Sequence, residues 1–130
     1  HYHRYAYPDN GRKTKNTFIP GVLHTVRPVA LRELPVFTEN AREYTVIRSE
    51  NFGDVLQMEV GAMLVGKIDN YHQEADVRRG QEKGRFLYGG STIILLLEPG
   101  TAAVTEKFFE ATRAGEETEV KMGEAIGRRG

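Results

Sequence analysis

The sequence contains no cysteine among its 130 residues. This absence excludes disulfide bridges, thiolate metal sites and a cysteine nucleophile. Net charge is also absent, because 18 Lys and Arg residues balance 18 Asp and Glu residues. Long apolar runs are missing too: the longest, 93–97, is far shorter than the roughly 20 residues of a membrane-spanning helix. We therefore expect no thiolate metal site, no nucleic-acid partner and no membrane span.

Internal repeats and low-complexity linkers are likewise absent, which predicts a single domain over residues 1–130. The opening residues, HYHRYAYP, have no apolar core of the kind found in signal peptides. They resemble an internal segment, and we expect a longer parent chain.

Most of the sequence shows the residue patterns of β-strands. Residues 21–26 and 44–49 are short β-branched segments bounded by Pro, Gly and Asn. Residues 54–69 alternate with the period of a half-buried strand and predict one long strand, or two strands joined at Gly61. Residues 92–97 are continuously apolar, which predicts a strand covered on both faces.

The C-terminal part adds one helix. Residues 104–114 predict it, with Thr105 as the cap and Gly115 at its end. Residues 119–127 predict a last strand and turn. The whole pattern predicts a mainly β fold, with antiparallel sheets in a compact sandwich or barrel-like domain and one short C-terminal helix.

The stretch Gly89-Gly90-Ser91-Thr92 directly precedes the apolar strand. One interpretation is a loop whose serine caps or bends the backbone. The other is chemical: glycine lets the backbone bend so that the Ser91 hydroxyl reaches the preceding carbonyl carbon. The amide then becomes an ester, elimination leaves a dehydroalanine at position 91, and hydrolysis converts it into a pyruvoyl ketone.

Several further segments accompany this motif, in a fixed order along nearly the whole chain. They are YHRY (2–5) with Pro8 and Gly11, PGVLHTV (20–26), VGKI (65–68), RGQEKGRF (79–86), GGST (89–92) and VKMGEAIG (120–127). In this set and order the sequence resembles the C-terminal half of the phosphatidylserine decarboxylase family.

The resemblance implies a pyruvoyl-dependent decarboxylase that is made as a self-cleaving proenzyme. Cleavage would fall between Gly90 and Ser91, giving a β part (1–90) and an α part (91–130) that stay associated. The substrate amine would form a Schiff base with the pyruvoyl group made from Ser91, and phosphatidylserine would yield phosphatidylethanolamine and carbon dioxide. The same chemistry on a free amino acid or on another serine phospholipid is the alternative. No metal is implied.

The resemblance also implies partners and a location. A phospholipid substrate requires contact with a membrane surface, and we expect a peripheral protein on the cytoplasmic side of a bacterial membrane. A homodimer is a further expectation.

The candidate acid–base groups follow from the same motifs. His3 matches the first of two family histidines and would protonate the decarboxylated intermediate. The second histidine, which activates the serine, falls on Ala6, whose methyl group cannot take a proton. The candidates for support are Thr92, His72, His24 and Asp9, of which His72 could replace the missing base. Asp9 could orient a histidine, although Pro8-Asp9-Asn10-Gly11 is also a turn sequence.

The candidate phosphate contacts are Arg4, Arg12 and Lys13, with Lys15 completing a local basic cluster. The alternative is that these side chains form a solvated face.

Two other functions remain open. A carrier module would use Lys121 beside Met122, although a carrier lysine belongs at a hairpin tip between two similar halves. A serine hydrolase would pair Ser91 with His72, although Ser91 lies outside a Gly-x-Ser-x-Gly elbow.

Overall fold

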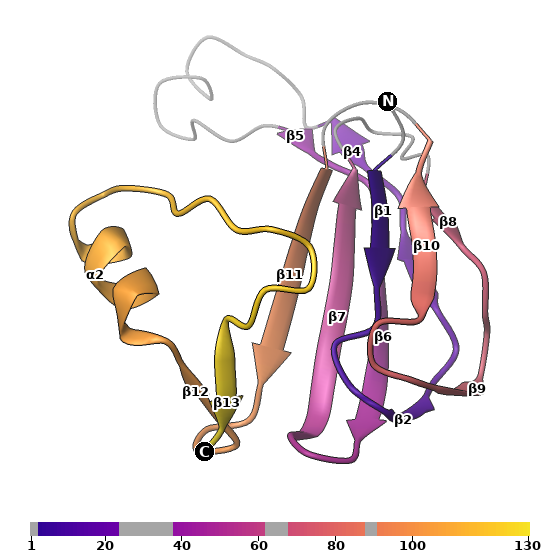
Figure 1. Ribbon diagram of the computed structural model, residues 1–130. Coiled ribbons are helices and arrows are strands. Elements are labelled where there is room, and N and C mark those ends of the chain that lie inside the picture. Colours follow the sequence, from indigo (N-terminus) through magenta and orange to yellow (C-terminus); the bar gives the residue numbers. More distant parts are fainter. Residues whose placement is uncertain (1–2, 24–37, 62–67, 88–90) are drawn as a thin grey trace, which may run out of the picture.

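A computed structural model describes residues 3–23, 38–61, 68–87 and 91–130 of the protein. Within these ranges the backbone is mostly β-strand with one short helix, so the predicted fold class is confirmed (Figure 1). The strands are β1 (His3–Ala6), β2 (Gly11–Lys13), β3 (Thr17–Ile19), β4 (Val22–Leu23), β5 (Thr38–Glu39), β6 (Arg42–Ser49), β7 (Gly53–Gly61), β8 (Ile68–Asn70), β9 (Ala75–Val77), β10 (Glu82–Phe86), β11 (Ser91–Leu97), β12 (Ala102–Val104) and β13 (Gly127–Arg129). The helix is α2 (Glu106–Arg113).

Two antiparallel sheets form a sandwich-like body. The larger sheet has the strand order β11-β7-β6-β2-β9, with β3 also paired to β6, and the smaller has the order β1-β10-β8. The smaller sheet lies against the β6–β7 side of the larger one, whereas α2, β12 and β13 lie on the other side of β11 (Figure 1). The start of β1, the end of β10 and the start of β11 lie at the same end of the body (Figure 1).

The hairpin of β6 and β7 is the centre of the larger sheet. Its register runs from Arg42 opposite Val60 to Ser49 opposite Gly53. Gly53 has φ 66°, a left-handed conformation that glycine adopts without steric cost. The predicted strand at 44–49 is confirmed as part of β6, and the predicted strand segment from 54 to Gly61 is confirmed as part of β7. Whether one strand or two run through 54–69 stays open, because residues 62–67 lie outside the described residues.

The C-terminal predictions are confirmed only in part. Helix α2 forms as expected, and Gly115 follows it with φ 76°. Thr105 is the N-cap residue, as predicted, but its side chain makes no capping hydrogen bond. The last strand is Gly127–Arg129 rather than part of 119–126, because only this later segment pairs with β12.

Strand β11 differs from its prediction. We expected it to be covered on both faces, but Ile93 and Ile94 are each 40% exposed and Leu96 is 56% exposed. Within the described residues β11 is an edge strand, since it pairs with β7 alone and no strand flanks its other side. A continuous apolar run identified the strand correctly but did not identify its neighbours.

The interior between the sheets is unusually polar. Ile47, Val77 and Tyr7 form an apolar cluster of buried side chains. The fold also buries polar side chains fully or almost fully, namely Asp9, Lys13, Thr45, Gln57, Glu59 and Lys83. Buried polar groups require internal partners, and their partners define the candidate site. No helix in the described ranges has the length and apolar character that crossing a bilayer would demand.

Candidate active site

Ser91 is the first residue of β11. Its register partner on β7 is Gly61, and the next pairs along the ladder are Thr92 with Val60 and Ile93 with Glu59. Gly90, on the other side of the expected cleavage point, lies outside the described residues. The backbone at position 91 therefore pairs with β7, and its partner on that strand is a glycine, Gly61.

His3 lies at the same end of the sandwich as Ser91. It is the first residue of β1 and pairs with Phe86, the last residue of β10, five positions before Ser91 in the chain. The His3 side chain is exposed. Tyr5, two residues further along β1, packs its ring against Phe86 with the ring centroids 5.1 Å apart. The fold thus brings the two predicted catalytic positions to one end of the molecule.

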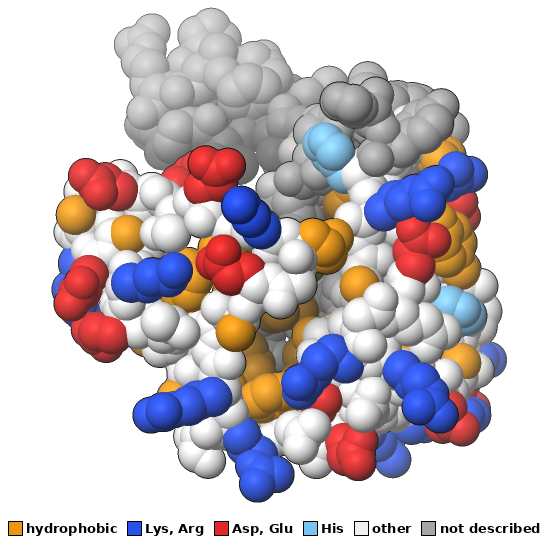
Figure 2. All heavy atoms as spheres, viewed as in Figure 1, with side chains coloured by type: hydrophobic (Ala, Val, Ile, Leu, Met, Phe, Trp, Pro, Cys, Tyr) orange, Lys and Arg blue, Asp and Glu red, His pale blue; other side chains and the backbone are white. Residues whose placement is uncertain are grey.

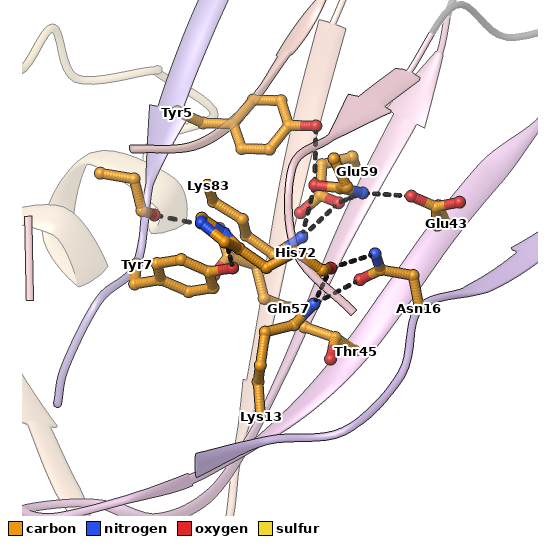
Figure 3. Close-up of polar contacts among 12 residues, drawn as sticks. Tyr5, Tyr7, Lys13, Asn16, Glu43, Thr45, Gln57, Glu59, His72 and Lys83 are labelled. Carbon is orange, nitrogen blue, oxygen red and sulfur yellow. Dashed lines mark hydrogen bonds and ion pairs between the residues drawn. The ribbon is translucent and has the colours of Figure 1, made fainter. Parts of the chain in front are cut away.

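A buried ion pair joins the two sheets beneath this end. Lys83 Nζ on β10 lies 2.7 Å from Glu59 Oε1 on β7, and both side chains are fully buried. Asn70 on β8 bridges them: its Oδ1 accepts from Lys83 Nζ at 2.8 Å, and its Nδ2 donates to Glu59 Oε1 at 2.9 Å. Asn70 Nδ2 also donates to Glu43, and Asn70 Oδ1 accepts from the Tyr5 hydroxyl at 3.1 Å. We call these five residues the Lys83–Glu59 cluster (Figure 3).

Burial governs the protonation of this cluster. Loss of solvation raises the pKa of Glu59 and lowers that of Lys83, while the charge of each partner opposes these shifts. Burial, followed by the charge of Glu59, raises the pKa of Tyr5 above its ordinary value, so Tyr5 remains a phenol donor. The cluster therefore contains a carboxylate of increased basicity that a lysine ammonium holds in place.

Gly84 makes the cluster possible. A Cβ at this position would collide with the backbone oxygen of Asp69, and would lie 2.8 Å from the Tyr5 hydroxyl oxygen and 2.9 Å from Asn70 Oδ1. Only a residue without a side chain lets the three strands of the smaller sheet approach at this point. The glycine after Lys83 is thus a packing requirement.

A second polar group lies next to the cluster. Lys13 Nζ donates to the carbonyl oxygen of His72 at 2.6 Å and to Asn16 Oδ1 at 2.9 Å. The Tyr7 hydroxyl lies 3.0 Å from His72 Nδ1 (Figure 3). Burial, with the nearby charge of Lys83, lowers the pKa of Lys13 to about 8. Burial, with the charge of Glu59, raises the pKa of Tyr7 to about 12.

His72 lies next to the Lys83–Glu59 cluster. Its Nδ1 is 3.0 Å from the Tyr7 hydroxyl, and its carbonyl oxygen accepts hydrogen bonds from Lys13 Nζ and Asn16 Nδ2. The role of His72 as a base for Ser91 and the Ser91–His72 hydrolase stay predictions.

The Asp9 carboxylate binds groups of neighbouring turns rather than a histidine. Its carboxylate accepts from the Asn51 backbone N at 2.8 Å, from Asn51 Nδ2 at 2.9 Å and from Arg79 Nη2 at 3.0 Å. Burial alone would raise the pKa of Asp9, but the hydrogen bonds from Asn51 and Asn10 and the charge of Arg79 lower it. Asp9 therefore holds the 8–11 turn against the β6–β7 turn.

The basic residues do not form one surface cluster. Alternate residues of a strand point to opposite faces, so Arg12 points outward whereas Lys13 is fully buried. Arg12 pairs with Glu74 at 3.2 Å and with Asp76 at 3.3 Å. Arg4 pairs with Glu82 at 3.4 Å. Acidic and basic side chains are likewise mixed on the face shown in Figure 2. Lys13 thus does not fit a surface phosphate contact.

The remaining candidates are placed as follows. Thr92 is exposed on β11, opposite Val60. His24 lies outside the described residues. Lys121 precedes a turn at 122–123, but no strand flanks that turn directly, so the hairpin that a carrier module needs is absent from this described segment. The described residues contain no group of three or more His, Asp or Glu side chains arranged to hold a metal ion.

Sequence reasoning missed the Lys83–Glu59 cluster. Alternation in β7 separated Leu56, Met58 and Val60 from Val55, Gln57 and Glu59, and the apolar set is the natural choice for the core. The structure buries the other set instead, because Glu59 and Gln57 find polar partners across the sandwich. A signal was present in the sequence: charges of opposite sign occur inside two strand patterns, at Glu59 and Lys83.

Comparisons with known proteins point to one family. A family model described as phosphatidylserine decarboxylase matches residues 1–128. A Clostridium acetobutylicum protein named phosphatidylserine decarboxylase proenzyme 2 is 48% identical over 126 residues, covering 97% of this chain and 43% of the relative. A Clostridium tetani phosphatidylserine decarboxylase proenzyme is 42% identical over 130 residues, covering 98% of this chain and 44% of the relative. The chain thus spans less than half the length of these relatives, and no solved structure gives a significant match.

Proposed function

The chain belongs to the phosphatidylserine decarboxylase family, and from this membership we propose that it carries the catalytic centre of a pyruvoyl-dependent decarboxylase. The proposed substrate is phosphatidylserine, and the proposed products are phosphatidylethanolamine and carbon dioxide. The observation that carries the proposal is the family match over residues 1–128, which includes the Gly-Gly-Ser-Thr motif at the start of β11.

The proposed maturation uses the atoms of Gly90 and Ser91. The Ser91 hydroxyl oxygen adds to the Gly90 carbonyl carbon, and the bond from that carbon to the Ser91 nitrogen breaks, leaving an ester. The Ser91 Cα proton then leaves and the Cβ–Oγ bond breaks, which releases a chain ending in the Gly90 carboxylate. The dehydroalanine at position 91 takes up one water and loses ammonia to give a ketone.

The surroundings of position 91 fit a pyruvoyl group. Gly61, the register partner of Ser91, contributes no side chain that would crowd the position. The β7 ladder holds the residues that follow, which suits a group that must be aligned with a substrate bond. The pyruvoyl group would supply a ketone that binds the substrate amine and accepts the electrons left by the departing carboxylate.

The ladder also supports the proposal that the two cleavage products stay together. β11 lies in the α part and β7 in the β part, and they pair at every position from Ser91 to Leu97. For a phospholipid substrate we further propose a peripheral location at the cytoplasmic face of a bacterial membrane.

The experiment that tests this function is intact mass spectrometry of the purified full-length protein. We expect two chains, the smaller one beginning at position 91 and lighter by one ammonia than a chain that begins with serine. That chain should react with phenylhydrazine, and the preparation should convert phosphatidylserine in vesicles into phosphatidylethanolamine. A single active chain without a reactive carbonyl would contradict the proposal, whereas turnover of free serine alone would redirect it to an amino acid substrate.

His3 is the proposed proton donor of the decarboxylation step, because imidazole is a common general acid in enzymes and the start of β1 lies at the same end of the body as the start of β11 (Figure 1). A His3→Gln variant should still cleave itself but should release carbon dioxide about 10²–10⁴-fold more slowly. The measurement is kcat, normalised to the ketone content of the same sample. An unchanged kcat per ketone would remove His3 from the mechanism.

A further inference from the structure

Self-cleavage needs a base at the Ser91 hydroxyl, and this requirement follows from the function proposed above. Ala6 on β1 supplies none. His72 lies between β8 and β9, of which β9 is at the edge of the larger sheet opposite β11, and its Nδ1 is 3.0 Å from the Tyr7 hydroxyl. A carboxylate on the strand next to β11 is therefore the group to consider.

Glu59 occupies such a position. It pairs with Ile93 while Ser91 pairs with Gly61, so positions 59 and 91 are diagonal neighbours on adjacent strands. Diagonal neighbours in an antiparallel pair are about 7–8 Å apart between Cα atoms, within reach of a long side chain. Alternate positions of a strand also share a face, and paired positions lie on the same face. Position 91 thus lies on the face of the larger sheet from which Glu59 extends.

One carboxylate oxygen of Glu59 has no hydrogen-bond partner among the described residues. Oε1 accepts from Lys83 Nζ and Asn70 Nδ2, whereas Oε2 is buried and makes no hydrogen bond to any described residue. An unsatisfied buried acceptor is costly and uncommon in folded proteins. Its presence beside the start of β11 indicates that a donor belongs there.

The other ionisable groups around Glu59 are less suited to act as the base. Lys83 on β10 and Lys13 on β2 donate hydrogen bonds through their Nζ atoms, and Tyr5 and Tyr7 have raised pKa values that keep them protonated. Glu43 on β6 is one strand further from β11 than Glu59.

We propose that Glu59 accepts the Ser91 hydroxyl proton during self-cleavage, and that Lys83 and Asn70 hold its carboxylate in place. As the Oγ–C bond forms, the proton moves to Glu59. As the C–N bond breaks, the same proton passes to the departing Ser91 nitrogen, so Glu59 ends the step unprotonated. Glu59 is the acid–base group of this step, and Lys83 is a positioning residue.

The test compares Glu59→Gln with Glu43→Gln in the full-length protein. Both changes replace a carboxylate by an amide of the same shape, both residues contact Asn70, and the two positions face each other across β6 and β7. Cleavage is followed after synthesis by the appearance of the chain that begins at position 91. We expect Glu59→Gln to slow cleavage about 100-fold or more and Glu43→Gln to change it only a few-fold.

A pH profile and a rescue variant complete the test. The wild-type cleavage rate should rise with pH as Glu59 ionises and then level off, a profile shaped by the surrounding Lys83, Lys13, Glu43, Tyr5 and Tyr7. Glu59→Asp keeps a carboxylate and should cleave at an intermediate rate. Cooperative thermal unfolding establishes whether each variant is folded.

The outcomes separate this inference from the function on which it rests. Wild-type cleavage in the Glu59→Gln variant, or equal slowing in Glu43→Gln, overturns the role of Glu59 and leaves the pyruvoyl function standing. If the Glu59 variants do not fold, a cleavage rate of the wild type that is independent of pH overturns it instead. An uncut wild-type protein without a ketone overturns both.

Discussion

A Ser91→Ala variant is expected to remain one uncut chain without a reactive carbonyl and without decarboxylase activity. Alanine keeps the β11 ladder, because the pairing uses backbone atoms only, but it removes the oxygen that attacks the Gly90 carbonyl. It also removes the leaving group of the elimination. Loss of cleavage and loss of activity should therefore be complete and should occur together.

The measurements are intact mass and phenylhydrazine labelling of the variant. A Ser91→Cys variant is the matched control, since a thiol is also a nucleophile and leaving group and should still give cleavage. Turnover of phosphatidylserine by an uncut Ser91→Ala protein would contradict the proposed pyruvoyl mechanism.

The second large effect is on stability. Lys83→Met removes one partner of an ion pair in which both side chains are fully buried. The carboxylate of Glu59 is then left buried without its cation, and such a loss typically costs about 3–5 kcal/mol of the free energy of unfolding. Replacing both partners by apolar residues, as in Lys83→Met with Glu59→Leu, should restore most of this loss.

Urea unfolding measures these differences, and the chain offers a matched control. Arg85, two residues along β10, pairs with Asp69 on β8 at 3.1 Å, but the two side chains are 36% and 41% exposed. An exposed pair of this kind contributes about 0–1 kcal/mol, so Arg85→Met should cost far less than Lys83→Met. Equal costs would show that burial is not what makes the Lys83–Glu59 pair important.

Local patterns predicted the elements of the fold well. Alternation located β7, the β-branched segment at 44–49 located β6, and Gly115 marked the end of α2. These features depend on residues that are close in the sequence. The coverage of β11 was predicted wrongly, because an apolar run describes the strand itself and not what lies beside it.

The candidate site was likewise predictable where it depends on residues close in the sequence, and not where it depends on contacts between distant strands. The motif before β11 identified Ser91, and its place at the start of a strand was readable from the apolar residues that follow. Lys83 and Glu59 are 24 residues apart and meet only when β10 and β7 face each other across the sandwich. Alternation showed which residues of β7 share a face, but the choice of buried face depended on partners from β8 and β10.

The pairing of β11 with β7 also has a consequence for renaturation. The uncut chain forms this ladder within one molecule, so its refolding rate does not depend on protein concentration. After cleavage before position 91, β11 and the rest of the larger sheet belong to separate polypeptides. Recovery from denaturant then becomes a second-order reassociation of the two chains. Maturation on the proposed route would thus turn a self-contained folding unit into a two-piece assembly whose native state is reached efficiently only once, before the cut.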